Sequence, residues 1–567
     1  MATFPPLLRS PPFPRVDTAE RAVSQRATIA QLDLSPERID MLFTRIREAR
    51  VGGTSWAAPA TFGPVTAALR PISATDAERM LAALSTGEAS HPLVLLPAQK
   101  WGRNAARKLR GRGIAVAVGE IDPWPLLASG TPWHLHGDDE LAALASIAGA
   151  PVQIHTPGRF GDERTSPEER AHIVTVDLLG ATRYRDPFTG EHQSVEEAIN
   201  LLALWRETID ANHRIAVAAG IAWWKRREIE RFLWAPRKRP LRFLTETGPA
   251  LAAASAAGGG IAVWPSRLPA EFRDEATRLG VPLIRVEDGF VRSVGLGSNL
   301  FPPFSVAVDR RGIHYDPSQP SDLEHLLETA SFPEPLIERA RALEAFIVRV
   351  GISKYGGSAA HPFPTRTPGR RLILVPGQVE DDMSVLLGGG GLASNLTLLE
   401  RVRALEPDAE IWFRPHPDVD AGHRRGAVSD EEALRHADRV VRGGGMAQLL
   451  DLVDGVHVLT SLTGFEALLR GRDVTTHGVP FYAGWGLTRD LGAIPDRRTR
   501  TLTLHELVAG VLILYPRYLD PVSFLPCPAE MLMSRLAEQV RPKATWLTTL
   551  RRLQGRLTSR RPHIASR

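Results

Sequence analysis

The chain has 567 residues, 43% of them hydrophobic and 23% charged, a balance typical of soluble globular proteins. A chain of this length forms about three to four compact units, and its one cysteine, Cys527, excludes an internal disulfide framework. The net charge of +5 comes from residues 541–567, which hold eight basic and no acidic residues. The remainder is not basic, which argues against nucleic acid as a partner.

The first third of the chain predicts a small α/β unit behind an irregular segment. Residues 1–90 are rich in proline and alanine, with helical patterns only near Glu37–Ala49 and Asp76–Leu84. From 91 to 190, short apolar runs alternate with helical patterns, which predicts a parallel sheet. The expected strands are Leu93–Pro97, Ile114–Val118 and Val152–Ile154, and the expected helices are Asn104–Arg112 and Asp139–Ile147.

A helical linker is expected over 191–235, after which the alternation of strands and helices starts again. It predicts two doubly wound, Rossmann-type domains at 236–365 and 366–525, followed by a C-terminal helix and basic tail at 526–567. Two such domains facing a cleft form the GT-B architecture, and their ligands bind at the carboxyl ends of strands. The expected strands are Ile261–Trp264, Leu283–Val286, Leu372–Val375, Ile411–Arg414, Arg439–Val441, Val456–Leu459 and Val474–Thr476.

An internal repeat relates the two halves of the chain. Arg183–Pro187 is similar to Arg517–Pro521, and each follows a segment that predicts a strand, a turn and a helix. Those upstream segments are Trp133–Leu141 and Val456–Ala467. We infer a duplicated module whose first copy is truncated and degenerate, because it has no obvious match to the polar motifs of the second.

The motif Thr460–Leu469 places small hydroxyl residues where a strand ends and a helix begins. Free amides at a helix N-terminus bind phosphate, which makes Ser461, Thr463 and the Gly464 amide candidate phosphate ligands. Glu466, in the first turn, is a candidate acceptor of hydrogen bonds from a ribose. The alternative is plain N-capping by Ser461 or Thr463, with Glu466 complementing the helix dipole.

A second motif, Trp412–Asp418, holds His416 between two prolines directly after a strand that ends at Arg414. Proline restricts its own φ angle and the residue before it. A rigid histidine at a strand end is well placed to donate to a phosphate. The alternative is an ordinary surface histidine.

Three successive carboxylates, Glu380, Asp381 and Asp382, follow another predicted strand. Such a cluster can bind a metal, act as a base or attack an anomeric carbon. It can also be a solvated acidic turn that caps the next helix, and spacing alone does not choose among these.

Glu287, Asp288 and Arg292 follow a strand of the preceding domain, on the opposite wall of the predicted cleft. The alternative for them is a surface network of ion pairs. In Gly478–Thr488, glycines among aromatic residues suggest either a loop close to a ligand or core packing. No Cys/His cluster has the spacing of a zinc site, so neither a metal nor a cofactor is expected.

Together these motifs resemble the β-Kdo transferases of bacterial capsule assembly. The segment Arg183–Leu233 also resembles the linker of the family's two-module members. The other resembling segments, in the family's order, are Glu287–Ser293, Pro302–Asp316, Ser353–Tyr355, Gly377–Ser384, Arg414–Val419, Thr460–Leu469 and Gly478–Thr488.

The resemblance implies CMP-β-Kdo as the donor substrate and a retaining reaction. It singles out Asp382 as a covalent nucleophile, within the cluster that starts at Glu380. It implies that Lys354 or Arg292 pairs with the carboxylate of Kdo or with the acceptor. The residues implied to bind CMP are Arg414, His416, Ser461, Thr463, Gly464 and Glu466.

The resemblance also implies a Kdo-terminated lyso-phosphatidylglycerol glycolipid as acceptor, and capsule assembly and export proteins as partners. In the tail, Trp546, Leu550, Leu553 and Leu557 fall at helical spacing among basic residues. This pattern is typical of a helix on an anionic membrane surface, or of one packed on the protein body. Met1–Val16 lacks the apolar run of a signal peptide, so we expect a cytoplasmic protein peripheral to the inner membrane.

The first module departs from the family pattern. It lacks counterparts of the Glu287, Asp382 and His416 motifs, and Glu140 aligns only loosely with Glu466. We therefore expect one active site, with a first module that is inactive or binds acceptor. The alternatives to Kdo transfer are transfer of another CMP-activated ulosonic acid, such as a sialic acid, and a non-catalytic role as a capsule-assembly scaffold.

Overall fold

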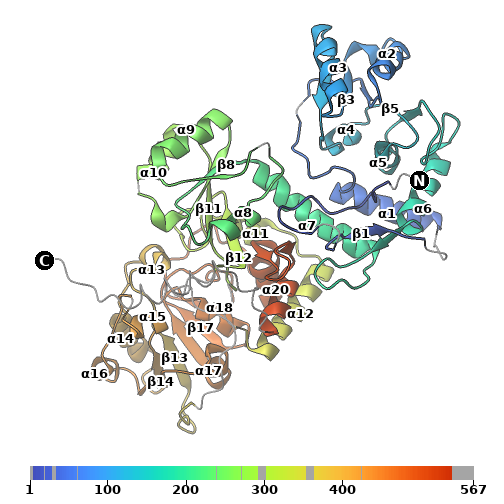
Figure 1. Ribbon diagram of the computed structural model, residues 1–567. Coiled ribbons are helices and arrows are strands. Elements are labelled where there is room, and N and C mark those ends of the chain that lie inside the picture. Colours follow the sequence, from blue (N-terminus) through green and yellow to red (C-terminus); the bar gives the residue numbers. More distant parts are fainter. Residues whose placement is uncertain are drawn as a thin grey trace. The chain divides into compact units, whose positions relative to one another are not determined.

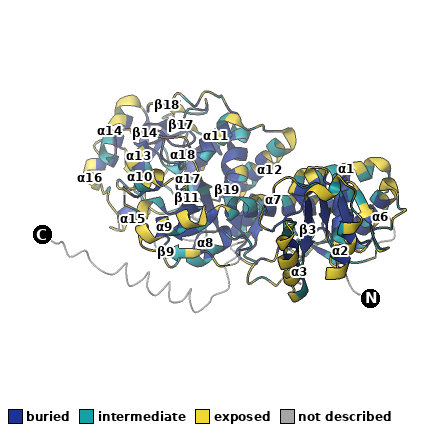
Figure 2. Cartoon of the chain, turned by 90° about the horizontal axis from the view of Figure 1, so that it is seen from above, coloured by how far each residue is buried: buried dark blue, intermediate teal, exposed yellow. Residues whose placement is uncertain are grey.

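The computed structural model describes residues 4–17, 20–28, 34–60, 62–237, 239–269, 271–291, 302–352, 363–422 and 424–538. The chain forms two compact units: Met1–Arg214 with Leu233–Pro240, and Ile215–Phe232 with Leu241–Arg567. In both, the strands are mostly buried and the helices expose their outer faces (Figure 2). Arg292, Lys354 and the tail at 541–567 lie outside the described residues. Within the described ranges, no helix combines the length and apolarity needed to cross a bilayer.

The first unit is built on a parallel five-stranded sheet in the order β4-β3-β2-β5-β6 (Figure 1). The strand order reverses between β2 and β5, as in doubly wound folds. A separate antiparallel pair joins β1 to β7. The elements are β1 (Ser24–Arg26), α1 (Pro36–Ala49), β2 (Ala67–Leu69), α2 (Ala74–Ala82), β3 (Pro92–Leu96), α3 (Lys100–Gly111), β4 (Ala115–Val118), α4 (Trp124–Ala128), β5 (Trp133–Leu135), α5 (Glu140–Ala148), β6 (Val152–Ile154), α6 (Pro167–Leu179), β7 (Thr182–Tyr184) and α7 (Val195–His213).

The second unit contains two sheets. The N-domain sheet has the order β20-β19-β12-β11-β10-β8-β9, with β9, β8, β10 and β11 parallel and the other three antiparallel to their neighbours. The C-domain sheet, β15-β14-β13-β16-β17-β18, is parallel throughout.

The elements up to β12 are β8 (Ile215–Ala219), α8 (Arg226–Phe232), β9 (Arg242–Leu244), α9 (Thr247–Ala257), β10 (Gly260–Val263), α10 (Glu271–Arg278), β11 (Leu283–Asp288) and β12 (Ser305–Asp309). Those from α11 to β15 are α11 (Asp322–Thr329), α12 (Glu334–Val350), β13 (Leu372–Pro376), α13 (Met383–Gly388), α14 (Asn395–Leu405), β14 (Glu410–Arg414), α15 (Pro417–Asp420), α16 (Asp430–Ala433) and β15 (Arg439–Val440). The rest are α17 (Met446–Leu452), β16 (Gly455–Val458), α18 (Leu462–Leu468), β17 (Asp473–Thr476), β18 (Arg489–Asp490), α19 (Leu504–Val508), β19 (Pro516–Leu519), β20 (Pro526–Cys527) and α20 (Ala529–Ala537).

The sheets draw on strands that local patterns do not reveal. The middle strand of the first unit, β2, lies within the segment 1–90 that was expected to be irregular, because its sequence Ala-Ala-Leu shows no alternation. The N-domain takes β8 from the expected helical linker 191–235 and β19 from beyond 510, so it extends outside 236–365. The pairing of Ser305 with Tyr518 in β12 and β19 joins distant parts of the chain, and no short window of sequence can show it.

Within the C-domain, the strands follow the order 3-2-1-4-5-6 in chain sequence, which is the order of the Rossmann fold. The order reverses between β13 and β16, and ligands of such sheets bind outside the carboxyl ends of the strands at this switch point. The three polar motifs after β13, β14 and β16 therefore emerge at one edge of the sheet (Figure 1).

Two side-chain arrangements recur in both units and support the predicted duplication. A buried tyrosine hydroxyl donates to the carbonyl six residues earlier, from Tyr184 to Leu178 and from Tyr518 to Leu512. A histidine pair also recurs, at 3.1 Å between His134 Nδ1 and His155 Nε2 and at 3.2 Å between His457 Nδ1 and His477 Nε2. These matches make β5 and β6 the counterparts of β16 and β17.

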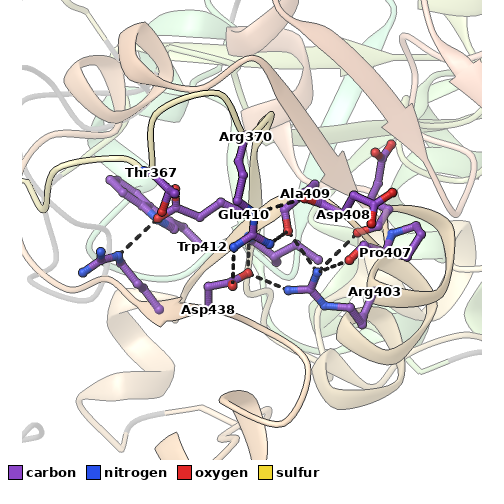
Figure 3. Close-up of polar contacts among 12 residues, drawn as sticks. Thr367, Arg370, Arg403, Pro407, Asp408, Ala409, Glu410, Trp412 and Asp438 are labelled. Atoms are coloured by element: carbon purple, nitrogen blue, oxygen red, sulfur yellow. Dashed lines mark hydrogen bonds and ion pairs between the residues drawn. The ribbon is translucent and has the colours of Figure 1, made fainter.

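The amino edge of the C-domain sheet, opposite the switch point, is held by charged side chains (Figure 3). Arg403 donates to the carbonyl of Ala409 at 2.9 Å and to Asp438 Oδ2 at 2.6 Å, while Asp438 Oδ2 accepts from the amide of Ile411 at 2.8 Å. Burial alone would raise the pKa of Asp438, but these hydrogen bonds and that from Arg370 lower it below its ordinary value. The ionised carboxylate therefore stabilises the fold.

Replacing Asp438 with alanine is expected to lower the free energy of unfolding by about 1–3 kcal/mol, because Arg403 and the Ile411 amide lose their acceptor. This decrease in the free energy of unfolding should reach its full size above pH 3.8, the ordinary pKa of the carboxyl in the unfolded chain. It should become smaller as the pH falls through the lower pKa that Asp438 has in the folded protein. Urea denaturation measures it. Asp408→Ala is the matched control, since Arg370 bonds to the backbone carbonyl of Asp408. Equal effects of the two variants would contradict the assignment.

Candidate active site

The carboxyl ends of β13 and β16 are joined by Gln378, a buried residue two positions after β13. Its Oε1 accepts from the amides of Leu459 at 3.1 Å and Thr460 at 3.0 Å, and its Nε2 donates to Thr460 Oγ1 at 2.9 Å. Gly377 binds the neighbouring strand, where its amide donates to the carbonyl of Arg414 at 2.8 Å. The motifs predicted from sequence thus converge at the switch point.

The three successive carboxylates have different surroundings. Glu380 Oε1 accepts from the amide of Asn395 at 2.8 Å and so holds the start of α14. Asp381 lies on the surface and pairs with Arg424 at 3.2 Å. Asp382 is the N-cap of α13, where its Oδ1 accepts from the amide of Ser384 at 3.0 Å. Asp382 therefore does cap the next helix, which was the alternative to a catalytic role.

Capping does not account for all of the Asp382 environment. Burial is the main cause of the raised pKa of Glu287, at the end of β11, and of Tyr315, in the loop after β12, and the charge of Asp382 adds to it in both. Asp382 is thus the member of the cluster that lies near acidic groups of the N-domain. A carboxylate of the C-domain thus acts electrostatically on acidic groups of the N-domain.

Burial, and then the neighbouring charges of Asp288 and Asp382, raise the pKa of Glu287 to about 7. Asp288 in turn accepts from Lys225 Nζ at 3.0 Å. That ammonium lies 3.4 Å from the centroid of the Trp264 ring, which helps to hold it. A carboxyl group with a pKa near neutrality is suited to take or give a proton at physiological pH.

His416 and Arg414 lie at the end of β14. His416 is the N-cap of α15, and its Nδ1 accepts from the amide of Asp418 at 3.1 Å. An imidazole that accepts at Nδ1 carries its proton at Nε2, the donor that a phosphate oxygen requires. Arg414 donates from Nη2 to the carbonyl of Gly444 at 2.7 Å, and its buried Nη1 has no hydrogen-bond partner in the described structure.

The segment after β16 begins α18 with Ser461 as N-cap, which was the alternative to a phosphate site. Ser461 Oγ accepts from the amide of Thr463 at 3.2 Å and lies 3.1 Å from Thr463 Oγ1. The amide of Gly464 already donates to the carbonyl of Ser461 at 3.1 Å. A Cβ on Gly464 would lie 2.2 Å from the hydroxyl of Tyr482, so this glycine is required by packing. The hydroxyls of Ser461 and Thr463 are therefore better phosphate ligands than the Gly464 amide.

Glu466 is the fifth residue of α18, one turn later than expected, and is buried. It is the one polar residue that lines a small cavity between the N-domain and the C-domain, among the residues described. The apolar lining consists of Phe290, Val291, Ile347, Ile352, Leu462, Phe465, Leu469 and Leu512. Glu466 is thus close to Ser461 and Thr463 along the chain, but its side chain faces an apolar cavity between the domains.

The aromatic loop Gly478–Thr488 packs into the core, as its alternative reading proposed. Tyr482 and Trp485 are fully buried, and Trp485 Nε1 donates to the carbonyl of Phe481 at 2.9 Å. The ring of Phe481 lies 4.5 Å from that of Phe290, which follows Glu287 and Asp288 in the N-domain. The two motifs therefore hold the domains together at the site.

Sequence reasoning missed three residues of this site: Gln378, Lys225 and Tyr315. Gln378 lies inside a recognised motif, and its place directly after a buried strand was the available signal. Lys225 lies in the expected linker and reaches Asp288 because β8 and β11 belong to one sheet. Tyr315 follows β12, a strand that was not predicted.

The switch point of the first unit has a different chemistry. Its helix α5 begins after Asp139, whose carboxylate caps the helix and pairs with Arg70 at 3.0 Å. Glu140, the first residue of α5, pairs with Arg9 at 2.6 Å and has no positional match to Glu466. The carboxylate of Asp139 thus stands where the second unit has the hydroxyl of Ser461, and Glu140 adds a second charge; both disfavour binding of a phosphate.

The chain is similar to several known proteins. Residues 260–518 match the family described as capsule polysaccharide biosynthesis protein. The capsule polysaccharide modification protein LipA of Neisseria meningitidis serogroup A is 37% identical over 418 residues, which are 73% of this chain and 57% of LipA. The lipopolysaccharide-processing protein LpsZ of Rhizobium meliloti is 45% identical over 250 residues, 43% of this chain and 56% of LpsZ. The chain thus spans little more than half the length of these relatives.

One solved structure is matched over almost its whole length. The Thermosulfurimonas dismutans protein described as KpsC, beta Kdo 2,4 transferase, is similar with a TM-score of 0.50 at 31% identity. The match covers 58% of this chain and 99% of that one. Together with the motifs at the switch point, these similarities show that the chain belongs to the capsule polysaccharide Kdo transferase family.

Proposed function

We propose that the second unit is a retaining glycosyltransferase of the GT-B type, which transfers Kdo from CMP-β-Kdo to a Kdo-terminated glycolipid in capsule polysaccharide biosynthesis. The observation that carries this proposal is the convergence of the Asp382, His416 and Ser461 motifs at a Rossmann switch point, with Glu287 of the other domain under the charge of Asp382. Membership of the family and the name of the KpsC structure support Kdo as the sugar.

In the first step, a carboxylate oxygen of Asp382 attacks the anomeric carbon of Kdo. The bond from that carbon to the phosphate oxygen breaks, and CMP leaves with the electron pair. Negative charge grows on the departing phosphate, which the Nε2–H of His416 and the hydroxyls of Ser461 and Thr463 stabilise. The product is a Kdo ester of Asp382.

In the second step, a hydroxyl of the acceptor attacks the anomeric carbon from the face that CMP has left. Its proton passes to the carboxylate of Glu287, and Asp382 leaves with the electrons of the ester bond. Each step inverts the anomeric carbon, so the two together retain its configuration. The pKa of Glu287 near 7 suits it to this role of base.

A transfer assay with the full-length chain tests the function. The chain is incubated with a Kdo-terminated glycolipid and either CMP-Kdo or a CMP-sialic acid, and the product is analysed by mass spectrometry and NMR. We expect one β-linked Kdo to be added from CMP-Kdo. Transfer from the sialic acid donor alone would favour the alternative donor, and binding of neither donor would favour a scaffold.

Calorimetric titration with CMP is expected to find one site per chain, because the helix after β16 begins with a hydroxyl cap, Ser461, whereas the helix after β5 begins with the carboxylate Asp139. His416→Asn should weaken CMP binding by roughly tenfold to a hundredfold, since it keeps an N-cap acceptor but loses the Nε2 donor. The matched control is His136→Asn in the first unit, where His136 bonds to Asp76 at 2.7 Å. Weaker CMP binding in that control would contradict the assignment.

A further inference from the structure

Tyr315 differs from every other tyrosine that the structure describes. The other four hydroxyls all bond within the protein: Tyr184 to Leu178, Tyr482 to Ser461, Tyr515 to Asp309 and Tyr518 to Leu512. The Tyr315 hydroxyl is buried and has no hydrogen-bond partner in the described structure. A buried polar group without a partner is destabilising, so its presence calls for an explanation.

The position of Tyr315 suggests that explanation. It lies in the N-domain loop between β12 and α11, where its ring packs edge-on against His314 at 5.3 Å between centroids. Its backbone also reaches the C-domain, because a Cβ on Gly388 would lie 3.4 Å from the carbonyl oxygen of Tyr315. Gly388 ends α13, the short helix that Asp382 caps.

The charges around Tyr315 point in the same direction. Burial raises the pKa of its hydroxyl most, followed by the carboxylates of Glu287 and Asp382. The hydroxyl therefore keeps its proton and remains a donor at any physiological pH. Neither carboxylate accepts a hydrogen bond from it, so its proton has no acceptor among the described residues.

We propose that the Tyr315 hydroxyl donates a hydrogen bond to an oxygen of the transferred sugar. This inference rests on the proposed function, because it takes Asp382 to attack that sugar. The proposed ligands of the nucleotide are His416 and Ser461, whereas the carboxylates that act on the Tyr315 hydroxyl are those of Glu287 and Asp382. Tyr315 is thus a substrate-binding residue of the donor-sugar subsite.

The test compares Tyr315→Phe with Tyr518→Phe in the full-length chain. Tyr315→Phe should lower kcat/KM for CMP-Kdo by roughly tenfold to a hundredfold, because the site then loses a hydrogen-bond donor to the sugar. It should leave CMP affinity unchanged, and its Tm should be equal to or above that of the wild type, because no protein hydrogen bond is lost. Tyr518→Phe should do the reverse, with a lower Tm and unchanged kcat/KM, because it breaks the bond to Leu512.

Three results would overturn the inference while the proposed function stands. These are an unchanged kcat/KM in Tyr315→Phe, a change only in the KM for the acceptor, or a fall in Tm as large as that of Tyr518→Phe. If the wild-type chain neither binds nor turns over CMP-Kdo, the proposed function fails and this inference fails with it. The two failures are distinguishable, because the second is seen in the unmodified protein.

Discussion

Replacing Asp382 with asparagine is expected to reduce Kdo transfer by about 10³-fold or more, because an amide cannot form the ester with the sugar. The side chain of asparagine keeps the Oδ1 acceptor that bonds to the amide of Ser384, so α13 should remain intact. The measurement is kcat for transfer from CMP-Kdo, together with CMP affinity as a check on the nucleotide site. We expect that affinity to be unchanged.

The matched control is Asp381→Asn, one residue earlier in the chain. Asp381 is exposed and pairs with Arg424 on the surface, where an ion pair contributes little to stability. Its replacement should leave transfer within about twofold of the wild type. If Asp382→Asn transferred sugar as well as the parent, or if Asp381→Asn were as inactive as Asp382→Asn, the assignment of the nucleophile would be wrong.

Replacing Glu287 with glutamine is expected to lower kcat by about 10²–10⁴-fold, because the acceptor hydroxyl loses its base. In the wild type, a base with a pKa of about 7 is ionised above that pH, so transfer should rise with pH through neutrality and then level off. Glutamine does not titrate, and the residual activity of the variant should lack this rise. A wild-type profile that is flat from pH 6 to 8 would contradict the role of Glu287.

The same substitution should stabilise the protein at pH 8. The folded pKa of Glu287, about 7, lies above the ordinary value of 4.5, so ionisation opposes folding. This destabilisation is absent below 4.5, grows between 4.5 and 7, and is complete above 7. Glutamine removes it, by at most about 3 kcal/mol at pH 8 and by nothing at pH 4. Unfolding in urea at the two pH values separates this effect from a general loss of structure.

The C-domain was the most predictable part of the molecule. Its first strand, Leu372–Pro376, is a continuous apolar run followed directly by a glycine, and such a pattern is local. The N-domain was less predictable, because β12 pairs with β19, and β8 enters from a segment that is helical on both sides. Such pairings depend on contacts between distant parts of the chain. The strand β2, with only Ala-Ala-Leu, is fixed by its neighbours on both sides.

The site shows the same contrast. The motifs that contain Asp382, His416 and Ser461 were recognisable because each follows a strand of one parallel sheet, whose carboxyl ends share an edge. Sequence could not tell that Glu380 holds α14 or that Gly464 packs on Tyr482, because both roles depend on a partner elsewhere in the fold. The unsatisfied hydroxyl of Tyr315 is likewise visible only once the surrounding side chains are in place.

The proposed reaction passes through a covalent Kdo ester of Asp382, and intact-mass measurement tests for this ester most directly. Glu287→Gln slows the second step, so incubation of this variant with CMP-Kdo in the absence of acceptor should let the ester accumulate. We predict a mass increase of one Kdo residue, mapped to the peptide that contains Asp382 and absent from the variant that also carries Asp382→Asn. An adduct on another residue, or none while the wild type turns over CMP-Kdo, would contradict the account.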